Sequence, residues 1–492
     1  MIHAHVHRKR KGERVMSQLL TRVQRVSDQQ LPQTIDGLFP ESIARQYGLR
    51  GSQTYEIVYG LTRTRMTLAP GTTSLTLKES AARPLHLAFG MAKLGLRFEP
   101  GEKRFVIGPL VGVLIAGMSP GPEGPFGNIT DFCREVSQTC RTRGGIGFVY
   151  TLSEVSAETN KLEGWTYRDG RWVKQLFPLP YCSYNRIGSR RIERKEETQT
   201  RLSILKQKGG LFFNEQFLDK WLIHQKLAVN SDASHLLPHT TLYTGASALQ
   251  AMLTRHSYVY VKPSSGSLGR GIIRIAWKNN EYICQYETIN GAATRHFRTF
   301  AALHQMLRPR LAKHSYLIQQ GLHLIRSHGG LLDFRALVQK DRTGKWAITS
   351  IVGRTGTRQS IVSNVARGGT MLPLVRALAT STLPTSMHAT VASTIRRQAL
   401  TVAHLFEQSM GGHYAELGID IAVERTGRVW LLEVNSKPSK TNDAVASTTS
   451  GPRPSVVRIV DYCFYRNGFT VLPRKKKSTA SKRSIQKRRT SQ

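Results

Sequence analysis

Two apolar segments near the end of the sequence constrain most strongly how this chain folds. Residues 418–423 read GIDIAV and residues 429–435 read VWLLEVN, with an Arg-Thr-Gly turn between them. Their β-branched and aromatic residues predict two strands joined by a tight turn. Three side chains with oxygen atoms lie inside these segments: Asp420, Glu433 and Asn435. Because a buried carboxylate needs a compensating cation or hydrogen bonds, the fold must place such a partner beside this hairpin.

The spacing of these three side chains predicts a metal site. Glu433 and Asn435 are two residues apart, so they point to the same face of a strand, and Asp420 lies across the turn. Mg²⁺ takes carboxylate and amide oxygens together with the oxygens of substrate phosphates. The alternative is a set of surface carboxylates at a sheet edge, and the apolar flanks argue against it.

A glycine-rich loop lies upstream of this hairpin, and its pattern excludes two common phosphate-binding motifs. Residues 258–272 read YVYVKPSSGSLGRGI. A Walker loop has its lysine after the glycines and opens a helix, whereas Lys262 comes before them. The glycines Gly266, Gly269 and Gly271 run in the reverse of the dinucleotide spacing GxGxxG. A strand, GIIRIAW, is predicted after the loop, so the helix N-terminus that both motifs use for phosphate is missing.

The remaining pattern is a strand, a lysine, a loop of small residues and a second strand. Without bulky side chains, the loop from Ser264 to Gly271 can bring backbone N–H groups against phosphate oxygens, with Lys262 at its root. A plain Gly/Ser hairpin is the alternative for this loop taken alone. The carboxylate hairpin downstream favours the phosphate loop.

The net charge of +39 over 492 residues predicts contact with polyanions. Residues 474–492 contain many Lys and Arg and no acid, which predicts a disordered basic tail. The excess of basic residues extends over the whole chain. Candidate partners are an anionic polymer, nucleic acid or an acidic protein layer, and the alternative is a surface that only sets solubility.

Three further features bear on the compartment. The longest apolar run, residues 105–117, contains a proline and is too short to span a bilayer. No apolar segment follows the basic N-terminus, so no secretory signal is predicted, and Met16 is an alternative start to Met1. Five cysteines without CxxC spacing favour a reducing interior such as the cytoplasm.

Composition and periodicity divide the chain into five segments. A strand, a helix over residues 128–143 with an asparagine cap and a second buried strand predict a parallel α/β domain, and the polar segment at 189–201 places its end near 200–210. The predicted segments are a basic N-terminal segment at 1–45 with weak helical spacing, a small β-rich region at 46–104, the α/β domain at 105–205, a domain at 210–470 and the tail at 474–492.

Local patterns predict the elements of the domain at 210–470. Apolar spacing in residues 390–407 gives one buried helical face. The other expected elements are a helix over 214–229, strands with a lid-like loop over 258–287, a helix over 298–312 and a strand over 315–319.

Five motifs in this domain resemble those of the ATP-grasp superfamily, in which two α+β lobes grip ATP. They are VKPSSGSLGRG, IQQGLHL, DFRALV, SNVARGGT and LLEVNSKPS, and they occur in the order found in that superfamily. Over a longer span that includes GWTYRDGRWVKQLFPLPYCSYNRI and FNEQFLDKWLIHQKL, the chain is similar to the YheC/YheD family of endospore coat-associated proteins. The resemblance implies a mixed α+β and α/β chain: an ATP-grasp fold preceded by a parallel α/β pre-ATP-grasp domain and a small β-rich region.

The resemblance also implies roles for the nucleotide-binding residues. Lys262 and Lys220, with Lys226 as the alternative to Lys220, would neutralise the α- and β-phosphates. The adenine would lie against the segment from Gln319 to Leu322, where Gln320 replaces a glutamate that is common in the superfamily. The cofactor-binding residues implied in this way are Lys220, Lys262, Ser264, Ser265, Gly266, Ser267, Gly269, Gly271, Gln319, Gln320 and Leu322.

For the chemistry, the resemblance implies cations near the γ-phosphate and the acyl substrate, and Asp420, Glu433 and Asn435 as ligands of one or two Mg²⁺. The residues at the reacting groups would be Arg335, Arg354, Asn364 and Arg367.

The implied function is that of an ATP- and Mg²⁺-dependent carboxylate–amine ligase that works through an acylphosphate, in the cytoplasm, the spore or the spore coat. Phosphoryl transfer needs charge neutralisation and alignment, and the sequence has no convincing Ser-His-Asp or Cys-His arrangement. Two alternatives stay open. One is a non-catalytic nucleotide-binding structural protein of the spore coat, and the other is a polyanion-binding protein.

Overall fold

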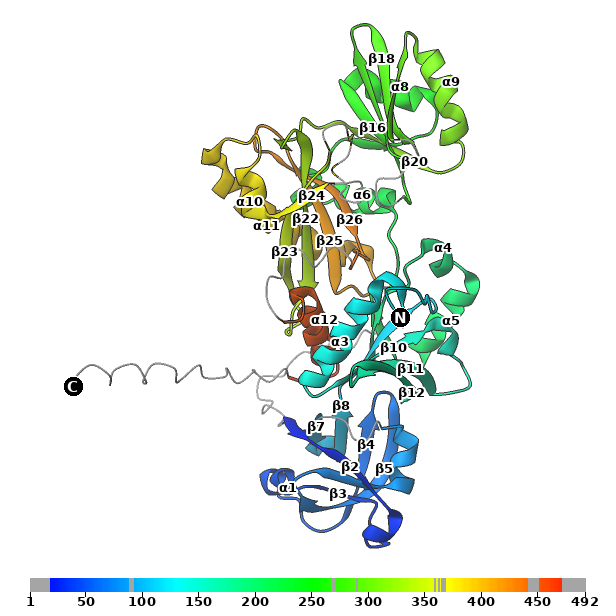
Figure 1. Ribbon diagram of the computed structural model, residues 1–492, viewed down its shortest axis with the longest axis vertical. Helices are drawn as coiled ribbons and strands as arrows, with labels where there is room; N and C mark the ends of the chain where they lie inside the picture. Colours follow the sequence, from blue (N-terminus) through cyan, green and yellow to red (C-terminus); the bar gives the residue numbers. More distant parts are fainter. Residues whose placement is uncertain are drawn as a thin grey trace, which may run out of the picture.

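The computed structural model describes residues 18–87, 93–266, 271–288, 291–357, 360–361, 363, 369–440 and 451–470. Four sheets follow one another along the long axis of the molecule (Figure 1). From the bottom of Figure 1 they belong to an N-terminal β domain, an α/β domain, a second lobe and a first lobe. The two lobes are named in chain order. The first lobe comprises residues 240–320, and the sheet of the second lobe comprises residues 326–435.

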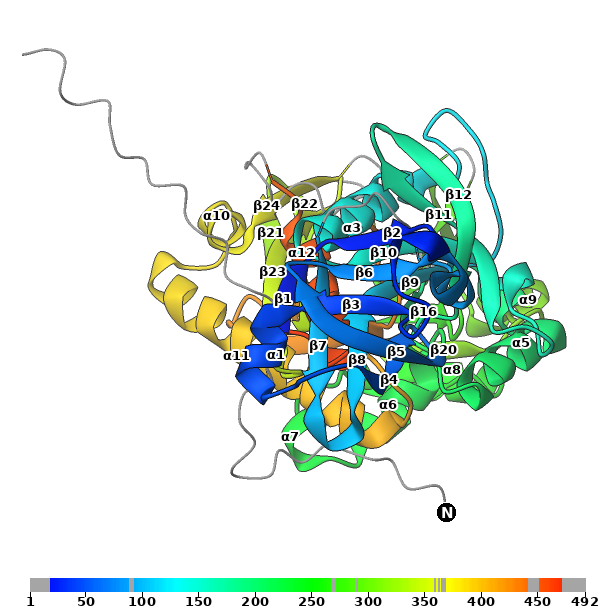
Figure 2. The same cartoon turned by 90° about the horizontal axis from the view of Figure 1, so that it is seen from below.

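The N-terminal β domain is an eight-stranded sheet in the order β1-β7-β8-β4-β5-β3-β6-β2, seen in front in Figure 2. Its two edge strands are separated in sequence by Arg22 alone, so the sheet curls until its edges lie next to each other. The elements are β1 (Gln18–Thr21), β2 (Val23–Val26), β3 (Gly37–Pro40), α1 (Glu41–Tyr47), β4 (Gln53–Tyr59), β5 (Thr62–Thr72), β6 (Leu75–Lys78), α2 (Glu79–Ala82), β7 (Leu94–Glu99) and β8 (Arg104–Gly108).

This sheet differs from the predicted segmentation at 1–45 and 46–104. Residues 18–40 supply three strands to the same sheet as the later β4 to β8, instead of a separate segment with weak helical spacing. β1 and β2 are four residues long and half-exposed, so they carry no clear alternation of apolar and polar residues. Pairing with β7 and β6, which lie far along the chain, fixes them as strands.

The α/β domain has a six-stranded sheet in the order β12-β11-β10-β9-β13-β14. Strands β10, β9, β13 and β14 run parallel, and β11 and β12 form an antiparallel hairpin at the edge. Every residue of β9 and β10 is buried, as expected for a parallel strand covered on both faces. The elements are β9 (Leu110–Ile115), α3 (Thr130–Thr142), β10 (Ile146–Thr151), β11 (Lys161–Arg168), β12 (Arg171–Pro178), β13 (Cys182–Asn185), α4 (Arg190–Glu193), α5 (Glu196–Gln207) and β14 (Leu211–Phe213).

One local prediction for this domain was wrong. Asn128 does not cap the helix, because a single 3-10 turn at Gly127–Ile129 precedes α3. The Thr130 hydroxyl instead accepts a hydrogen bond from the Phe126 N–H at 3.0 Å and donates one to the Gly127 carbonyl at 2.8 Å. The end of this domain was predicted near 200–210, and its sheet extends to β14. The polar segment at 189–201 forms α4 and the first half of α5, and α5 packs its apolar side on the core that this domain shares with the N-terminal sheet.

The first lobe is an antiparallel sheet in the order β15-β20-β16-β17-β18-β19, covered by two helices. The expected helix over 298–312 and strand over 315–319 are confirmed as α9 and β20. The elements are β15 (Thr240–Leu242), α8 (Ala246–Arg255), β16 (Tyr258–Pro263), β17 (Ile273–Lys278), β18 (Glu281–Thr288), β19 (Gly291–Phe297), α9 (Phe300–Leu311) and β20 (Tyr316–Gln320).

The second lobe is a sheet in the order β24-β23-β22-β25-β26, with β21 paired to β22. The predicted buried face of α11 is confirmed, since Val391, Ile395, Ala399, Val402 and Phe406 all lie in the core of this lobe. The elements are α6 (Lys220–Ala228), α7 (Ser231–Ser234), β21 (Arg326–Ser327), β22 (Gly330–Lys340), β23 (Trp346–Thr355), β24 (Thr370–Pro373), α10 (Leu374–Ala379), α11 (His388–Met410), β25 (Glu416–Val423) and β26 (Val429–Asn435).

The helix predicted over 214–229 begins later, at Lys220. Asn214 has a positive φ of 57°, and its side chain bonds the backbone of β25 instead of starting a helix. The Asp219 carboxylate caps α6 by accepting from the N–H groups of Trp221 and Leu222. None of the described helices has the length and apolar character that a bilayer span requires.

The last helix, α12 (Pro454–Arg466), returns to the α/β domain (Figure 1). It packs against α3 and also contacts β22 of the second lobe. Its buried residues Val456, Ile459, Val460, Cys463 and Phe464 share a core with Val111 and Phe132. The sequence placed 210–470 in one domain, whereas this helix joins the second lobe to the α/β domain.

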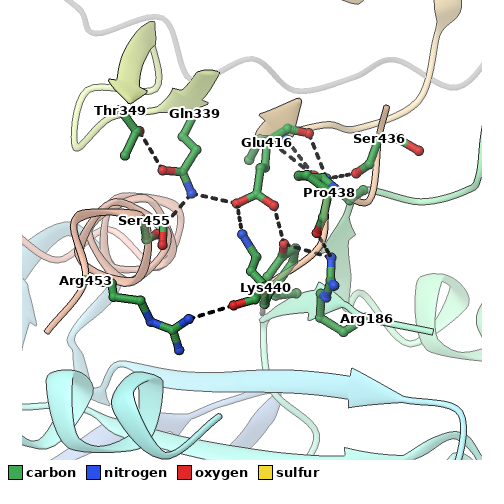
Figure 3. Close-up of polar contacts among 12 residues, drawn as sticks. Arg186, Gln339, Thr349, Glu416, Ser436, Pro438, Lys440, Arg453 and Ser455 are labelled. Carbon is green, nitrogen blue, oxygen red and sulfur yellow. Dashed lines mark hydrogen bonds and ion pairs between the residues drawn. The ribbon is translucent and has the colours of Figure 1, made fainter. Parts of the chain in front are cut away.

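A buried polar network holds this junction together (Figure 3). The Glu416 carboxylate, at the start of β25, is fully buried. It accepts hydrogen bonds from the Tyr184 hydroxyl at 2.6 Å, the Gln339 amide at 2.7 Å and the Lys440 ammonium group at 2.6 Å. These partners come from β13, β22 and the segment after β26, so one carboxylate connects the α/β domain to both ends of the second lobe.

Replacing Lys440 with methionine is expected to lower the free energy of unfolding by about 3–5 kcal/mol, because the buried Glu416 carboxylate loses its cation. Urea unfolding followed by tryptophan fluorescence measures the change. The exposed Lys345 in the β22–β23 turn gives the control Lys345→Met, expected within about 0.5 kcal/mol of the wild type. Adding Glu416→Gln to Lys440→Met is expected to recover part of the loss. A Lys440→Met variant as stable as the wild type contradicts the role given to this pair.

Candidate functional site

A cavity of about 900 Å³ lies where the two lobes and the α/β domain meet. The first lobe contributes residues of β16 and β20, and the second lobe contributes residues of β22, β23, β25 and β26. From the α/β domain it is lined by the end of β9 and the residues after it, by the residues that follow β13 and by the turn before α3. Of the predicted site residues, the cavity is lined by Lys220, Lys262, Gly266, Gln319, Gln320, Leu322, Arg335, Arg354, Asp420, Glu433 and Asn435.

Lys262 and Gln319 meet in the first lobe because β16 and β20 pair antiparallel. The Lys262 ammonium group donates to the Gln319 side-chain oxygen, and the Gln319 amide donates to the Thr240 hydroxyl at 3.1 Å. Burial, followed by the nearby positive charge of Lys220, lowers the pKa of Lys262 to about 8. A buried cation whose charged form is disfavoured in this way is typical of a site that binds an anion.

The root of the glycine loop is attached to the start of α6. The Lys220 N–H donates to the Ser264 carbonyl at 3.1 Å, and the Lys220 ammonium group donates to the Gly266 carbonyl at 2.7 Å. The same ammonium group lies 3.7 Å from the Glu433 carboxylate. The structure thus brings Lys220, the loop and the hairpin strand together.

The other residues predicted to bind the phosphates differ in how the structure places them. Gly271 has a φ of +76°, a left-handed conformation that favours glycine. Ser265 is exposed beside the buried Ser264, and Ser267 and Gly269 lie outside the described residues. Lys226, the alternative to Lys220, is exposed in the last turn of α6.

The predicted adenine segment comprises the last two residues of β20 and the two residues after it. Its backbone passes so close to Tyr258 that a Cβ at Gly321 would lie 2.1 Å from the ring, so only glycine fits. The Tyr258 hydroxyl donates to the Leu322 carbonyl. The Gln320 side-chain oxygen accepts from the His239 N–H at 3.0 Å, so this amide is engaged within the protein instead of facing the cavity with its oxygen free.

Two arginines and two aspartates form an ionic cluster on the second-lobe sheet. Asp333 lies opposite Arg354 in the β22–β23 pair, and Arg335 lies opposite Asp420 in the β22–β25 pair. Both oxygens of Asp333 accept from Arg354 at 2.7 Å, and both oxygens of Asp420 accept from Arg335. Arg354 also lies 3.1 Å from Asp420 and so joins the two pairs.

The electrostatics of this cluster follow from its geometry. Burial raises the pKa of the Asp420 carboxyl, but the charges of Arg335 and Arg354 outweigh it and hold that pKa below its usual range. Burial lowers the pKa of Arg354, but the charges of Asp333 and Asp420 raise it by a larger amount. The pKa of Arg354 therefore lies above the ordinary arginine value. Asp420 is therefore ionised, as an oxygen ligand for a cation must be.

The three predicted metal ligands lie close together on β25 and β26 and offer only oxygen donors. Asp420 lies directly opposite Glu433 in the β25–β26 pair, and Asn435 lies opposite Gly418 two positions away. No group of three His, Cys, Asp or Glu suited to a metal occurs among the described residues. The set is two carboxylates and one amide, all oxygen donors that line the cavity, which fits Mg²⁺ when further oxygens come from a bound substrate.

Some site residues escaped the sequence reasoning, and some predicted residues cannot be placed. Asp333 was missed, although its spacing of two from Arg335 indicated a shared face. Lys437 was missed because its partner Glu193 belongs to the α/β domain. Burial lowers the pKa of Lys437 to about 8 despite the opposing charge of Glu193. Asn364 and Arg367 lie outside the described residues.

Comparison with known proteins identifies relatives of the chain. A family described as "YheC/D like ATP-grasp" matches residues 209–465. The endospore coat-associated protein YheD of Bacillus subtilis strain 168 is 30% identical over 338 residues, which cover 68% of this chain and 73% of the relative. The endospore coat-associated protein YheC of the same organism is 21% identical over 300 residues, which cover 60% and 82%.

Solved structures were also compared. D-alanyl-alanine synthetase A from Vibrio cholerae O1 biovar eltor has a TM-score of 0.42 and 12% identity, over 73% of this chain and 99% of that one. The ATP-grasp ligase PsnB complexed with a minimal precursor has a TM-score of 0.40 and 14% identity, over 73% and 99%. The family match and the curated relatives confirm the resemblance to the ATP-grasp and YheC/YheD proteins that the motifs predicted.

Replacing Lys262 with methionine is expected to raise the melting temperature of the ligand-free protein, because the change removes a cation whose pKa the fold depresses to about 8. The folded pKa lies below the unfolded one, so the penalty is complete below pH 8 and shrinks as the pH rises toward the ordinary lysine range. The gain should therefore be largest at neutral pH. Lys278→Met, at the exposed end of β17, is the matched control and should leave the melting temperature unchanged. A lower melting temperature for Lys262→Met would count against this account.

Proposed function

This chain belongs to the YheC/D-like ATP-grasp family, and from that premise we propose that it binds Mg²⁺-ATP in the cavity and ligates a carboxylate to an amine through an acylphosphate. The single observation that carries the proposal is the convergence of Lys220, Lys262, Arg335 and Arg354 with Asp420 and Glu433 on one cavity. Such a set provides the charge neutralisation that phosphoryl transfer requires.

The first lobe would hold the nucleotide. Lys262 and Lys220 lie at the root of the glycine loop and would donate to the α- and β-phosphates. The loop itself would place backbone N–H groups over them, and the segment from Gln319 to Leu322 would lie against the adenine. Since the Gln320 oxygen accepts from His239, backbone groups of this segment are the better candidates for reading the base.

Asp420, Glu433 and Asn435 would hold the magnesium ion. When bound, Mg²⁺ neutralises charge on the phosphate oxygens and orients them. Both Asp420 oxygens accept from Arg335 in the ligand-free protein, so the carboxylate must release part of this contact to bind a cation. That release frees guanidinium N–H groups for an anion.

The reaction would proceed in two balanced steps. A carboxylate oxygen of the substrate attacks the γ-phosphorus, the bond from that phosphorus to the bridging oxygen breaks, and ADP leaves. The amine nitrogen of the second substrate then attacks the acyl carbon, phosphate departs with the electron pair of the acyl C–O bond, and the amine loses a proton to solvent. Arg335 and Arg354 would neutralise the oxygens of the transferred group. Asn364 and Arg367 belong to this proposal through the family pattern alone.

The substrates would approach from the α/β domain. Ile115, Phe126, Ile129 and Arg186 line that end of the cavity, together with Lys437 of the second lobe. The relatives named endospore coat-associated support a place in the spore or its coat. The basic composition supports an anionic polymer or an acidic coat protein as a partner.

Replacing Glu433 with glutamine is expected to weaken Mg²⁺-dependent ATP binding at least about tenfold, because the site loses one of its two carboxylates. Isothermal titration with and without Mg²⁺ measures the loss. Glu281→Gln, at the start of β18 in the first lobe and away from the residues that line the cavity, is the control and should bind like the wild type. ADP release upon addition of a carboxylate and an amine distinguishes a ligase from a protein that only binds nucleotide. Binding of polyanions without any Mg²⁺-dependent ATP binding would refute the proposal.

The ATP affinity of the wild type is expected to fall as the pH rises through about 8, because Lys262 loses its proton over that range. The cation is present below its pKa and absent above it, so the affinity should be highest at neutral pH. In Lys262→Arg the guanidinium stays charged throughout, and the decline should flatten. Fluorescence titration with a labelled ATP analogue at a series of pH values measures both curves. Parallel curves for the two proteins would contradict this role of Lys262.

A further inference from the structure

Arg354 contacts two carboxylates that both line the cavity, and it holds one of them more firmly than the other. It makes two hydrogen bonds of 2.7 Å to Asp333, whose side chain is 5% exposed, and a single contact of 3.1 Å to Asp420. Asp333 and Arg354 are directly opposite in the β22–β23 pair, so their side chains leave the sheet side by side. Arg354 reaches Asp420 across β22, the strand between them.

The two carboxylates therefore compete for one guanidinium group. Asp420 already accepts two hydrogen bonds from Arg335, and Arg354 adds a second positive charge beside it. Each arginine that pairs with Asp420 weakens the binding of a metal cation to the same oxygens, because it repels the cation and occupies the carboxylate. Because Arg354 makes two hydrogen bonds to Asp333, it is held away from a closer contact with Asp420 and repels a cation there less strongly.

Removal of Asp333 would change this balance in a defined direction. The side chain of Arg354 is only 15% exposed, and a buried cation needs a partner. With Asp333 neutral, the nearest remaining carboxylate within reach is that of Asp420. Arg354 would then pair more closely with Asp420 and oppose a metal ion there.

We propose that Asp333 is a positioning residue that holds Arg354 and thereby leaves Asp420 available to a divalent cation. The inference rests on the proposed function in one respect, namely that Asp420 is a metal ligand. Asp333 also lines the cavity, but both of its oxygens accept from Arg354, so it would act through Arg354 and not as a ligand of the metal. The same contact fixes the Arg354 guanidinium on the cavity wall, where it faces the transferred phosphoryl group.

The test is Mn²⁺ binding in the absence of nucleotide, measured by electron paramagnetic resonance of the free ion on the full-length protein. Asp333→Asn is expected to weaken Mn²⁺ binding about five- to tenfold, within the usual range of coupling between two sites. The matched control is Asp341→Asn at the other end of the same hairpin, where the carboxylate caps a turn by accepting from the Thr343 and Lys345 N–H groups. It also removes an aspartate from the β22–β23 hairpin, and it should leave Mn²⁺ binding unchanged.

The double variant Asp333→Asn, Arg354→Gln separates positioning from a structural role. With the competing guanidinium removed, Mn²⁺ binding should return to the wild-type value or exceed it, whereas simple damage to the sheet would leave it weak. If Asp333→Asn does not fold, Arg354→Gln alone serves, because it should bind Mn²⁺ at least as tightly as the wild type.

Three results would overturn the inference: Asp333→Asn binding like the wild type, a double variant as weak as Asp333→Asn, or weaker binding by Arg354→Gln. If the wild type binds Mn²⁺ and Asp333→Asn binds it equally well, the role of Asp333 is refuted, but the proposed function is not. A wild type that binds no Mn²⁺, with or without ATP, removes the metal site and the inference together.

Discussion

The fold depends on buried carboxylates that have buried partners. Glu416 at the start of β25 is enclosed by a lysine, a tyrosine and a glutamine from three different parts of the chain. Isolated, such a charge would carry a desolvation penalty of several kcal/mol, so the partners must arrive together for the junction to form. The strand β25 is fixed to the α/β domain by this network, and the segment after β26 is fixed with it (Figure 3).

The same strand carries the proposed catalytic chemistry. Glu416 and Asp420 are four residues apart on β25 and lie on the same face. The first is satisfied within the protein, whereas the second faces the cavity and is held by arginines that a substrate anion can also use. The junction at the start of β25 therefore fixes the strand that carries Asp420, and a fixed strand is what pre-organised electrostatic catalysis at the proposed site would need.

The sequence predicted the parts of this protein that depend on local pattern and motif order. The hairpin of β25 and β26, the buried face of α11 and the lysine before the glycine loop were all legible from spacing. Contacts between residues far apart in the sequence could not be predicted. Strands β1 and β2 are defined by pairing with β7 and β6, α12 by packing on α3, and the Glu416 network by a contact with Tyr184 across more than two hundred residues. Asp333 was missed for a different reason, because an aspartate two residues before an arginine is also typical of ordinary strand polarity, and its partner Arg354 lies on the next strand.

The central claim is that Mg²⁺-ATP binds between the two lobes, against Lys262 on one side and Asp420 on the other. Amide hydrogen exchange followed by mass spectrometry, with and without Mg²⁺-ATP, tests it most directly. The account predicts slower exchange on both walls at once, in residues 258–266 and 316–322 of the first lobe and in residues 418–435 of the second, with little change in β1 to β8. Protection confined to one lobe, or absent from both at saturating Mg²⁺-ATP, would contradict it.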